Sequence, residues 1–76
     1  MTNMKLLENF QDELSKRIRP SKAKFKLDRN EESIIFGDYA IYASSYNHGK
    51  FDLYKDINQI LSNKTSSEII NFIDKL

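Results

Sequence analysis

The stretch Ile34–Tyr54, IIFGDYAIYASSYNHGKFDLY, decides the fold, because it is the part of the chain that reads continuously as β-sheet. Gly37 and Asp38 separate two apolar runs. Glycine at the first central position suits a two-residue type II′ hairpin turn, where φ must be positive. The turn predicts that Phe36 faces Tyr39 across the hairpin, and that the next residues along the two strands face each other in the same register.

Alternation along these strands assigns each side chain to one of two faces. The more apolar face, which we assign to the core, carries Ile34, Phe36, Tyr39, Ile41 and Ala43. The other face carries Ile35, Ala40, Tyr42, Ser44 and Tyr46. A second reversal falls at Asn47-His48-Gly49, and its register is open by one residue, which decides the face of every side chain that follows.

Before this stretch, the sequence predicts a helix and a strand. Apolar residues recur at spacings of three and four over residues 4–18, the period of one helical face, with Thr2 or Asn3 as the N-cap and Pro20 as the stop. Residues 22–27 then alternate lysine with apolar residues, as in a half-buried strand. The expected strands are 22–27, 32–36, 39–46 and 50–55.

After the stretch, we expect two helices. Asp56 is positioned to cap a short helix in which Ile57, Ile60 and Leu61 share one side. Residues 65–68, Thr-Ser-Ser-Glu, match a capping box that begins the last helix. The predicted fold is therefore α+β, a single α-ββββ-α-α domain over residues 1–76. Its antiparallel meander has three to four strands, with an N-terminal helix and two C-terminal helices packed on one face.

Composition excludes several classes of chemistry. The 76 residues include no cysteine, which removes disulfides, zinc–thiolate sites and cysteine nucleophiles. Both glycines fit turns, no phosphate-binding loop is present, and His48 stands alone as a turn residue. We expect no enzyme activity, no cofactor and no metal site. No apolar run approaches the ~20 residues of a membrane span, so a soluble protein of the cytoplasm is expected, that of the host cell if a phage encodes it.

Charge is concentrated in residues 16–29, called the basic tract, where seven Lys and Arg residues stand against a single Asp. Its cations are Lys16, Arg17, Arg19, Lys22, Lys24, Lys26 and Arg29. Three interpretations stay open: a solvated surface, a contact for an acidic protein, or a phosphate-binding surface for nucleic acid.

Tyrosines on the second face of the sheet suggest a partner-binding surface. We predict that this surface consists of Ile35, Tyr42 and Tyr46, flanked by Lys22, Lys24 and Lys26. Exposed tyrosines are good interface anchors, and they also stack on bases, although ordinary partial burial is equally consistent with the pattern. The same face would serve a homodimer, so both a monomer and a homodimer are compatible with the sequence.

Two resemblances bear on function. A helix, a meander and a closing helix are similar in outline to the double-stranded-RNA-binding domain, but the last helix here begins Thr65-Ser66-Ser67-Glu68 and lacks that family's lysine-rich start. In size and layout the chain also resembles small accessory proteins of phages and mobile elements of the anti-CRISPR type. That resemblance implies a non-catalytic binding module that docks on a protein or ribonucleoprotein partner and inhibits or modulates it.

Overall fold

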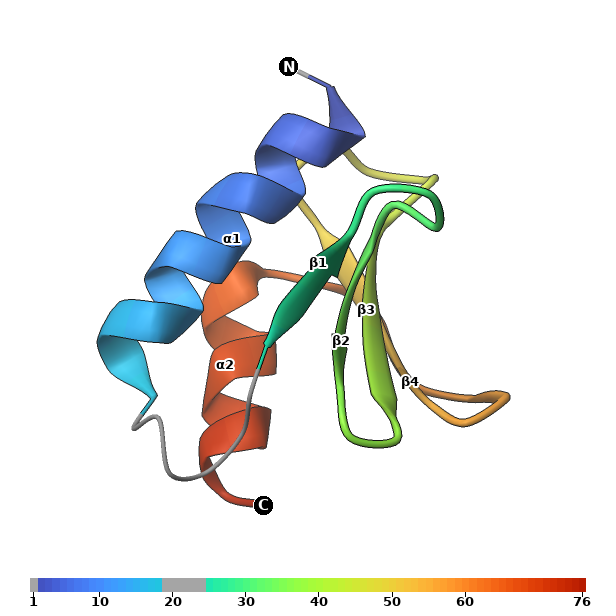
Figure 1. Cartoon of the computed structure of the whole chain (residues 1–76). Helices are drawn as coiled ribbons and strands as arrows, with labels where there is room; N and C mark the ends of the chain where they lie inside the picture. Colours follow the sequence, from blue (N-terminus) through green and yellow to red (C-terminus); the bar gives the residue numbers. More distant parts are fainter. Residues whose placement is uncertain (1, 19–24) are drawn as a thin grey trace.

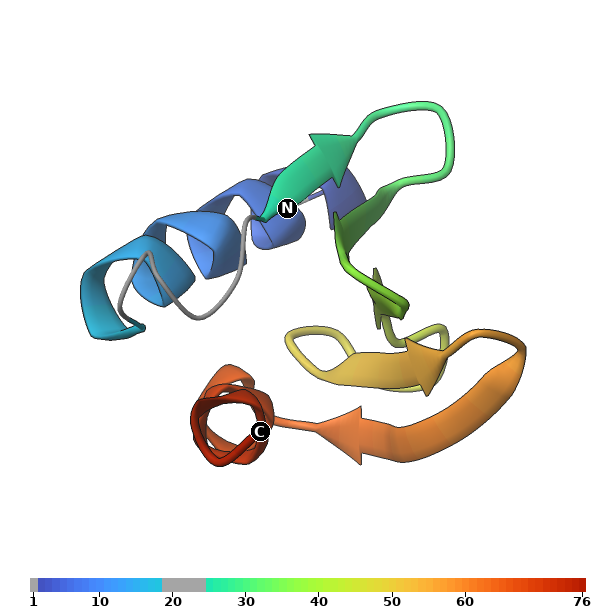
Figure 2. The same cartoon turned by 60° about the horizontal axis from the view of Figure 1, so that its bottom comes forward.

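The computed structural model describes residues 2–18 and 25–76, which form a five-stranded antiparallel sheet with two helices (Figure 1). The elements in chain order are α1 (Asn3–Arg17), β1 (Lys26–Asp28), β2 (Ser33–Phe36), β3 (Tyr39–Ala43), β4 (Phe51–Lys55), β5 (Asn58–Lys64) and α2 (Ser66–Asp74). The strands lie in the sheet in chain order, so the sheet is a meander. Both helices cover the same face, and the other face is left open (Figures 1 and 2).

The β2–β3 hairpin has the predicted register. Phe36 pairs with Tyr39, and Ile34 pairs with Ile41. Gly37 has a φ of +56°, while Asp38 is not among the residues with positive φ, as a type II′ turn requires. The predicted core face is confirmed, because Ile34, Phe36 and Ile41 are buried and Tyr39 and Ala43 pack against them.

Strand β3 is shorter than predicted, because it ends at Ala43 and not at Tyr46. The Oγ of Ser44 accepts hydrogen bonds from the backbone N–H groups of Tyr46 at 3.2 Å and Asn47 at 3.5 Å, which bends the chain out of the sheet. The register that the sequence left open is now fixed, since Ala43 pairs with Phe51. Phe51 and Leu53 therefore face the core.

The predicted short helix after Asp56 is wrong, because residues 58–64 form the fifth strand, β5. Its seven residues pair with the five of β4, and the register shifts between Phe51 and Leu53 and again between Leu53 and Tyr54. Each shift is a β-bulge that inserts an extra residue. The helix-like spacing of Ile57, Ile60 and Leu61 therefore spans the turn before β5 and the bulged strand itself.

Strand β1 also differs from the prediction of a strand over residues 22–27. It spans Lys26–Asp28, and residues 22–24 lie outside the described residues. Leu27 pairs with Ile34 on the core face, and Lys26 pairs with Ile35 on the open face. A polar turn then leads into β2, and the Oδ1 of Asp28 accepts the backbone N–H groups of Asn30 at 3.0 Å and Glu31 at 3.1 Å.

The core lies between the sheet and the two helices. Its buried side chains come from α1 (Leu7, Phe10, Leu14), from Ile18 after it, from α2 (Ile69, Ile70, Ile73) and from the core face of the sheet. The ring of Phe10 meets that of Phe51 edge-on, with centroids 4.6 Å apart. The predicted N-cap Thr2 and the predicted capping box of Thr65 and Glu68 are both present, so both helices begin where the sequence places them.

Candidate functional site

The open face of the sheet is the candidate functional site, and the strand registers arrange its side chains in two rows across the strands. One row runs through Lys26, Ile35, Ala40, Tyr54 and Gln59. The other row runs through Asp28, Ser33, Tyr42 and Asp52. Neither helix reaches this side, so the side chains of the rows that are not buried meet solvent or a partner, whereas Ser33 is fully buried (Figure 2).

Two tyrosines form the aromatic part of this face. Tyr42 and Tyr54 are diagonal neighbours on β3 and β4, and their rings meet edge-to-face with centroids 5.5 Å apart and planes at 86°. Diagonal aromatic neighbours on antiparallel strands are within reach of each other, and this arrangement suits their ring quadrupoles. Both side chains are half-buried, so part of each ring stays accessible.

A hollow of about 310 Å³ lies beside the tyrosine pair. It is lined by Tyr42, Asp52, Tyr54, Asp56 and Ile57. Tyr42 faces Asp52 across the strands, and the turn between β4 and β5 brings Asp56 and Ile57 to the rim. Ile57 is 92% exposed at this rim. The hollow therefore combines aromatic walls, two carboxylates and an exposed apolar rim.

Backbone hydrogen bonds hold both acidic residues in place. The Oδ1 of Asp52 accepts the N–H of Asn63 at 2.7 Å, where β5 bulges and Asn63 adopts a φ of +58°. The backbone N–H of Asp56 donates to the carbonyl of Asp38 at 2.8 Å, which joins the β4–β5 turn to the β2–β3 turn. Asp52 keeps acceptor capacity beyond this one bond, and the bond of Asp56 is made by its backbone N–H. Both carboxylates can therefore accept from a ligand.

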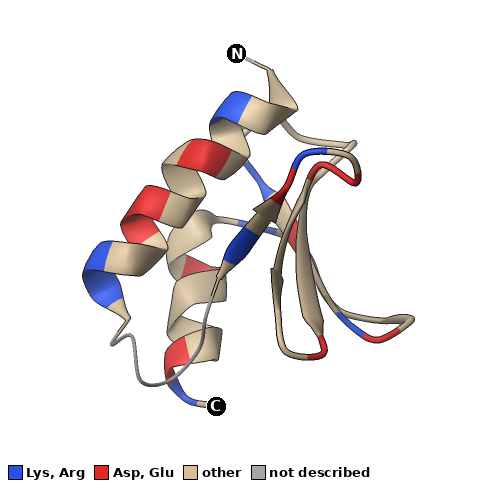
Figure 3. Cartoon of the chain, viewed as in Figure 1, with Lys and Arg blue, Asp and Glu red and all other residues tan. Residues whose placement is uncertain are grey.

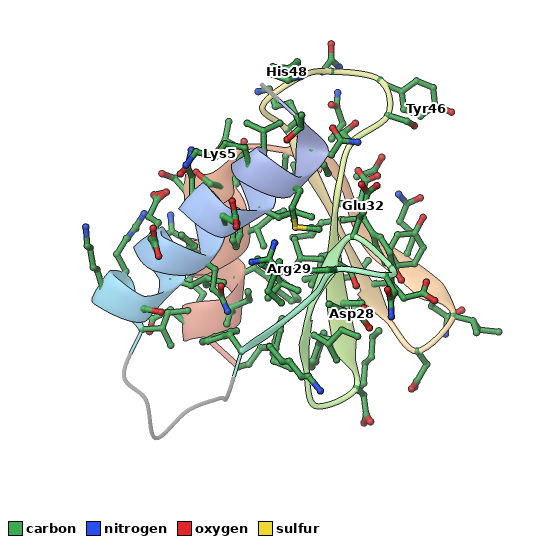
Figure 4. The ribbon with its side chains drawn as sticks, turned by 45° about the horizontal axis from the view of Figure 1, so that its top comes forward. Lys5, Asp28, Arg29, Glu32, Tyr46 and His48 are labelled. Carbon is green, nitrogen blue, oxygen red and sulfur yellow. The ribbon has the colours of Figure 1, made fainter. Side chains whose placement is uncertain are left out.

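The structure brings together some of the predicted partner-binding residues. Ile35, Tyr42 and Lys26 share the open face. Tyr46 is 84% exposed on the loop beyond β3, where its ring points away from the body of the protein (Figure 4). Lys22 and Lys24 lie outside the described residues. Of the described residues in the predicted surface, those on the strands therefore lie together, and Tyr46 lies apart from them on the loop.

The described cations of the basic tract are dispersed and partly paired with carboxylates (Figure 3). Arg17, at the end of α1, lies 3.5 Å from Glu13 and donates to Asn71 of α2 at 3.2 Å. Arg29 reaches from the β1–β2 turn to Glu8 of α1 at 3.2 Å. Lys16 is exposed on α1 and Lys26 on β1, while Arg19, like Lys22 and Lys24, lies outside the described residues.

Sequence reasoning missed the acidic side of this site. Asp52 and Tyr54 join the open face only once the β3–β4 register is fixed, and that register was ambiguous by one residue. Asp56 and Ile57 were assigned to a helix start, although they form a turn in which Asp56 has a φ of +55°. Aspartate tolerates this left-handed conformation better than most residues, and that preference was the available signal.

Two further properties concern the described residues as a whole. Within residues 2–18 and 25–76, no three His, Cys, Asp or Glu side chains gather closely enough to hold a metal ion. Neither described helix is long and apolar enough to cross a membrane. His48 is exposed on the loop between β3 and β4, on the same loop as Tyr46 (Figure 4).

Comparison of the chain with protein-family models found no matching family, and comparisons with curated proteins and with solved structures found no match.

Proposed function

We propose that the protein is a small non-catalytic binding module that docks through the open face of its sheet on a protein or ribonucleoprotein partner and modulates it. One observation carries the proposal. Both helices pack on a single face, and the other face presents an accessible tyrosine pair beside a hollow with an exposed isoleucine at its rim. The resemblance to anti-CRISPR accessory proteins supports inhibition as the mode of action.

The composition of this face matches what protein interfaces use. Tyrosine is enriched at interfaces because its ring buries a large area while its hydroxyl stays hydrogen-bonded. Anchor residues cluster near the centre of an interface, and Tyr42 and Tyr54 occupy the middle strands of the sheet. Ile35 and Ala40 extend the apolar surface toward β1. A partner that covers this face would remove these side chains from water.

The test compares partner capture by the wild-type chain and by open-face variants from the same cell extract. Tyr42→Ala and Tyr54→Ala are expected to lose the captured partner, because each removes one ring of the central pair. Circular dichroism and thermal melting check that the variants stay folded. A captured partner is then purified, and its affinity is measured with each variant.

Tyr46→Ala is the matched control, because it removes the same side chain from the loop beyond β3. We expect it to keep most of the affinity. If the folded Tyr42→Ala and Tyr54→Ala variants bind as well as the wild type, the open face is not the docking surface. If the purified protein forms a stable oligomer that these variants disperse, the face serves self-association and the proposed function is wrong.

A further inference from the structure

We propose that the hollow beside Tyr42 and Tyr54 receives the guanidinium group of an arginine from a basic segment of the protein partner. This inference rests on the proposed function and names the chemistry of the partner at that same face. The basic tract suggests an acidic partner. The carboxylates of the described open face instead suit a basic one.

Charge at the hollow is of one sign. Asp52 and Asp56 line it, and no lysine or arginine is among its lining residues. Lys55 belongs to the same strand as Tyr54, but its Nζ lies over the ring of Tyr39 on the core-facing side, 5.7 Å from the centroid. The cation that shares the open face among the described residues of the strands is Lys26, on β1. Three strand spacings separate β1 from β4, about 14 Å, which exceeds the screening length in physiological salt.

The aromatic walls select the kind of cation. A positive group over a tyrosine ring is attracted by the ring quadrupole, and arginine makes this contact more often than lysine. The guanidinium is planar, so it can stack on one ring while its N–H groups donate to a carboxylate. The rings of Tyr42 and Tyr54 stand at 86° to each other, and both residues line the hollow. A carboxylate beside an aromatic face is therefore suited to arginine.

Size favours one side chain over a larger ligand. The hollow measures about 310 Å³. Pockets for drug-sized ligands run from about 300 to 1,000 Å³, so this one stands at the lower limit. Ile57, 92% exposed at the rim, offers an apolar contact for the methylene groups of an arginine or for the residue next to it. The site accordingly fits one arginine within an extended segment.

One acceptor, the carboxylate of Asp52, is held in place before a ligand arrives, and the turn that carries Asp56 is fixed through its backbone. The N–H of Asn63 fixes Asp52 at 2.7 Å, and the bond from Asp56 to Asp38 fixes the turn. Pre-orientation lowers the entropy cost of binding. The contrast is a second hollow, between β5 and α2, whose lining mixes Lys64, Lys75 and Glu68 and so favours neither sign.

The experiment is a titration followed by amide chemical shifts, with the full chain and a neutral-ended pentapeptide, alanine-arginine-leucine-arginine-alanine, as the probe. We expect saturable shifts at the amides of Tyr54, Asp56 and Ile57. Replacing both arginines by citrulline keeps their shape and removes their charge, and we expect it to weaken binding about tenfold. A lysine peptide is expected to bind more weakly than the arginine peptide.

The variants test the carboxylates directly. The double substitution Asp52→Asn and Asp56→Asn is expected to weaken the arginine peptide about tenfold. Asparagine keeps the oxygen that accepts the N–H of Asn63, so the bulge is expected to stay intact. Asp12→Asn on α1 changes the net charge outside the hollow, and it is expected to leave the affinity unchanged.

Four results overturn the inference, three in measurements on this chain with its probe peptides and one in partner capture. The first is equal binding of the arginine and citrulline peptides, and the second is an equal loss of affinity in Asp12→Asn. The third is self-association in sedimentation that the double variant disperses, because the occupant would then be a second copy of this chain. If a partner captured by the wild type is lost with Tyr42→Ala but kept by the double variant, the inference fails while the proposed function stands. No loss with Tyr42→Ala contradicts the proposed function itself.

Discussion

Two serines are buried in the described part of the chain, and they differ in what their hydroxyl groups contact. Ser33, which is 0% exposed, lies on β2 next to Tyr42, and its Oγ has no hydrogen-bond partner among the described residues. Ser44, which is 7% exposed, accepts two backbone N–H groups and donates to the Oδ1 of Asn63 at 3.4 Å. A buried polar group without a partner costs free energy, whereas a satisfied one stabilises its surroundings.

Replacing each serine by alanine is therefore expected to change the free energy of unfolding in opposite directions. Ser33→Ala is expected to raise the free energy of unfolding by about 1 kcal/mol, because it removes an unpaired buried hydroxyl. Ser44→Ala is expected to lower it by about 1–2 kcal/mol, because two N–H groups lose their acceptor. For a domain of this size, 1 kcal/mol moves Tm by about 4–8 °C, which thermal melting resolves. A lower Tm for Ser33→Ala would mean that its hydroxyl has a partner in solution.

At the scale of elements, helix α2 depends on the two residues that begin it. The Oγ1 of Thr65 accepts the N–H of Glu68 at 3.2 Å, and the carboxylate of Glu68 accepts from the backbone N–H of Thr65, also at 3.2 Å. The backbone N–H of Thr65, and after it the Thr65 hydroxyl, which donates to the same carboxylate oxygen at 3.0 Å, hold the pKa of Glu68 below its ordinary value of 4.5. Folding therefore favours the ionised form of the Glu68 carboxylate, which accepts these hydrogen bonds.

Linkage gives the pH dependence of this cap. Because the folded pKa is lower than the unfolded one, the stabilisation is present above pH 4.5 and is lost as pH falls through the folded pKa. Glu68→Gln keeps an acceptor and removes the charge, so the wild type is expected to be more stable at pH 7 and to lose that advantage in acid. Urea unfolding from pH 3 to 7 measures the difference. A constant gap across this range would contradict the linkage, and Glu31→Gln, which caps no helix, is the control.

The elements that sequence reasoning predicted correctly are those with local signals. The turn at Gly37, the cap at Thr65 and the apolar stripe of α1 each depend on residues close in the chain. The prediction for residues 58–64 was wrong, because the bulges of β5 are set by its pairing with β4, and the apolar pattern that remains resembles that of a helix. The same error left Asp56 and Ile57 out of the predicted site, since both belong to the turn that joins β4 to β5. Tyr42 and Ile35 were placed correctly, because the β2–β3 turn fixes their face.

At the scale of the whole molecule, the described Lys and Arg residues are distributed over several elements, with Asp and Glu residues between them along the chain (Figure 3). The chain carries a net charge of +1, and two of the tract's arginines, Arg17 and Arg29, lie beside glutamates. Nucleic-acid affinity depends on the number of phosphates that free cations neutralise. These two arginines are therefore less available to neutralise phosphates.

We therefore expect weak nucleic-acid binding, with dissociation constants above about 10⁻⁴ M near 0.2 M salt, for short duplex DNA, duplex RNA and single strands. A fluorescence-anisotropy titration at about 50 and 200 mM salt measures it. Reversal of Lys22, Lys24 and Lys26 to glutamate is the comparison variant. Micromolar binding that falls steeply with salt and disappears in this variant would contradict the expectation and assign phosphate contacts to the basic tract.

The two bulges of β5 have a consequence for how copies of this protein meet one another. A flat outer strand offers its free N–H and C=O groups to a neighbouring chain, and such pairing is how sheets grow into fibrils. The extra residues of β5 twist its edge and interrupt the regular spacing of those groups. Strand capture at this border is therefore disfavoured at high concentration.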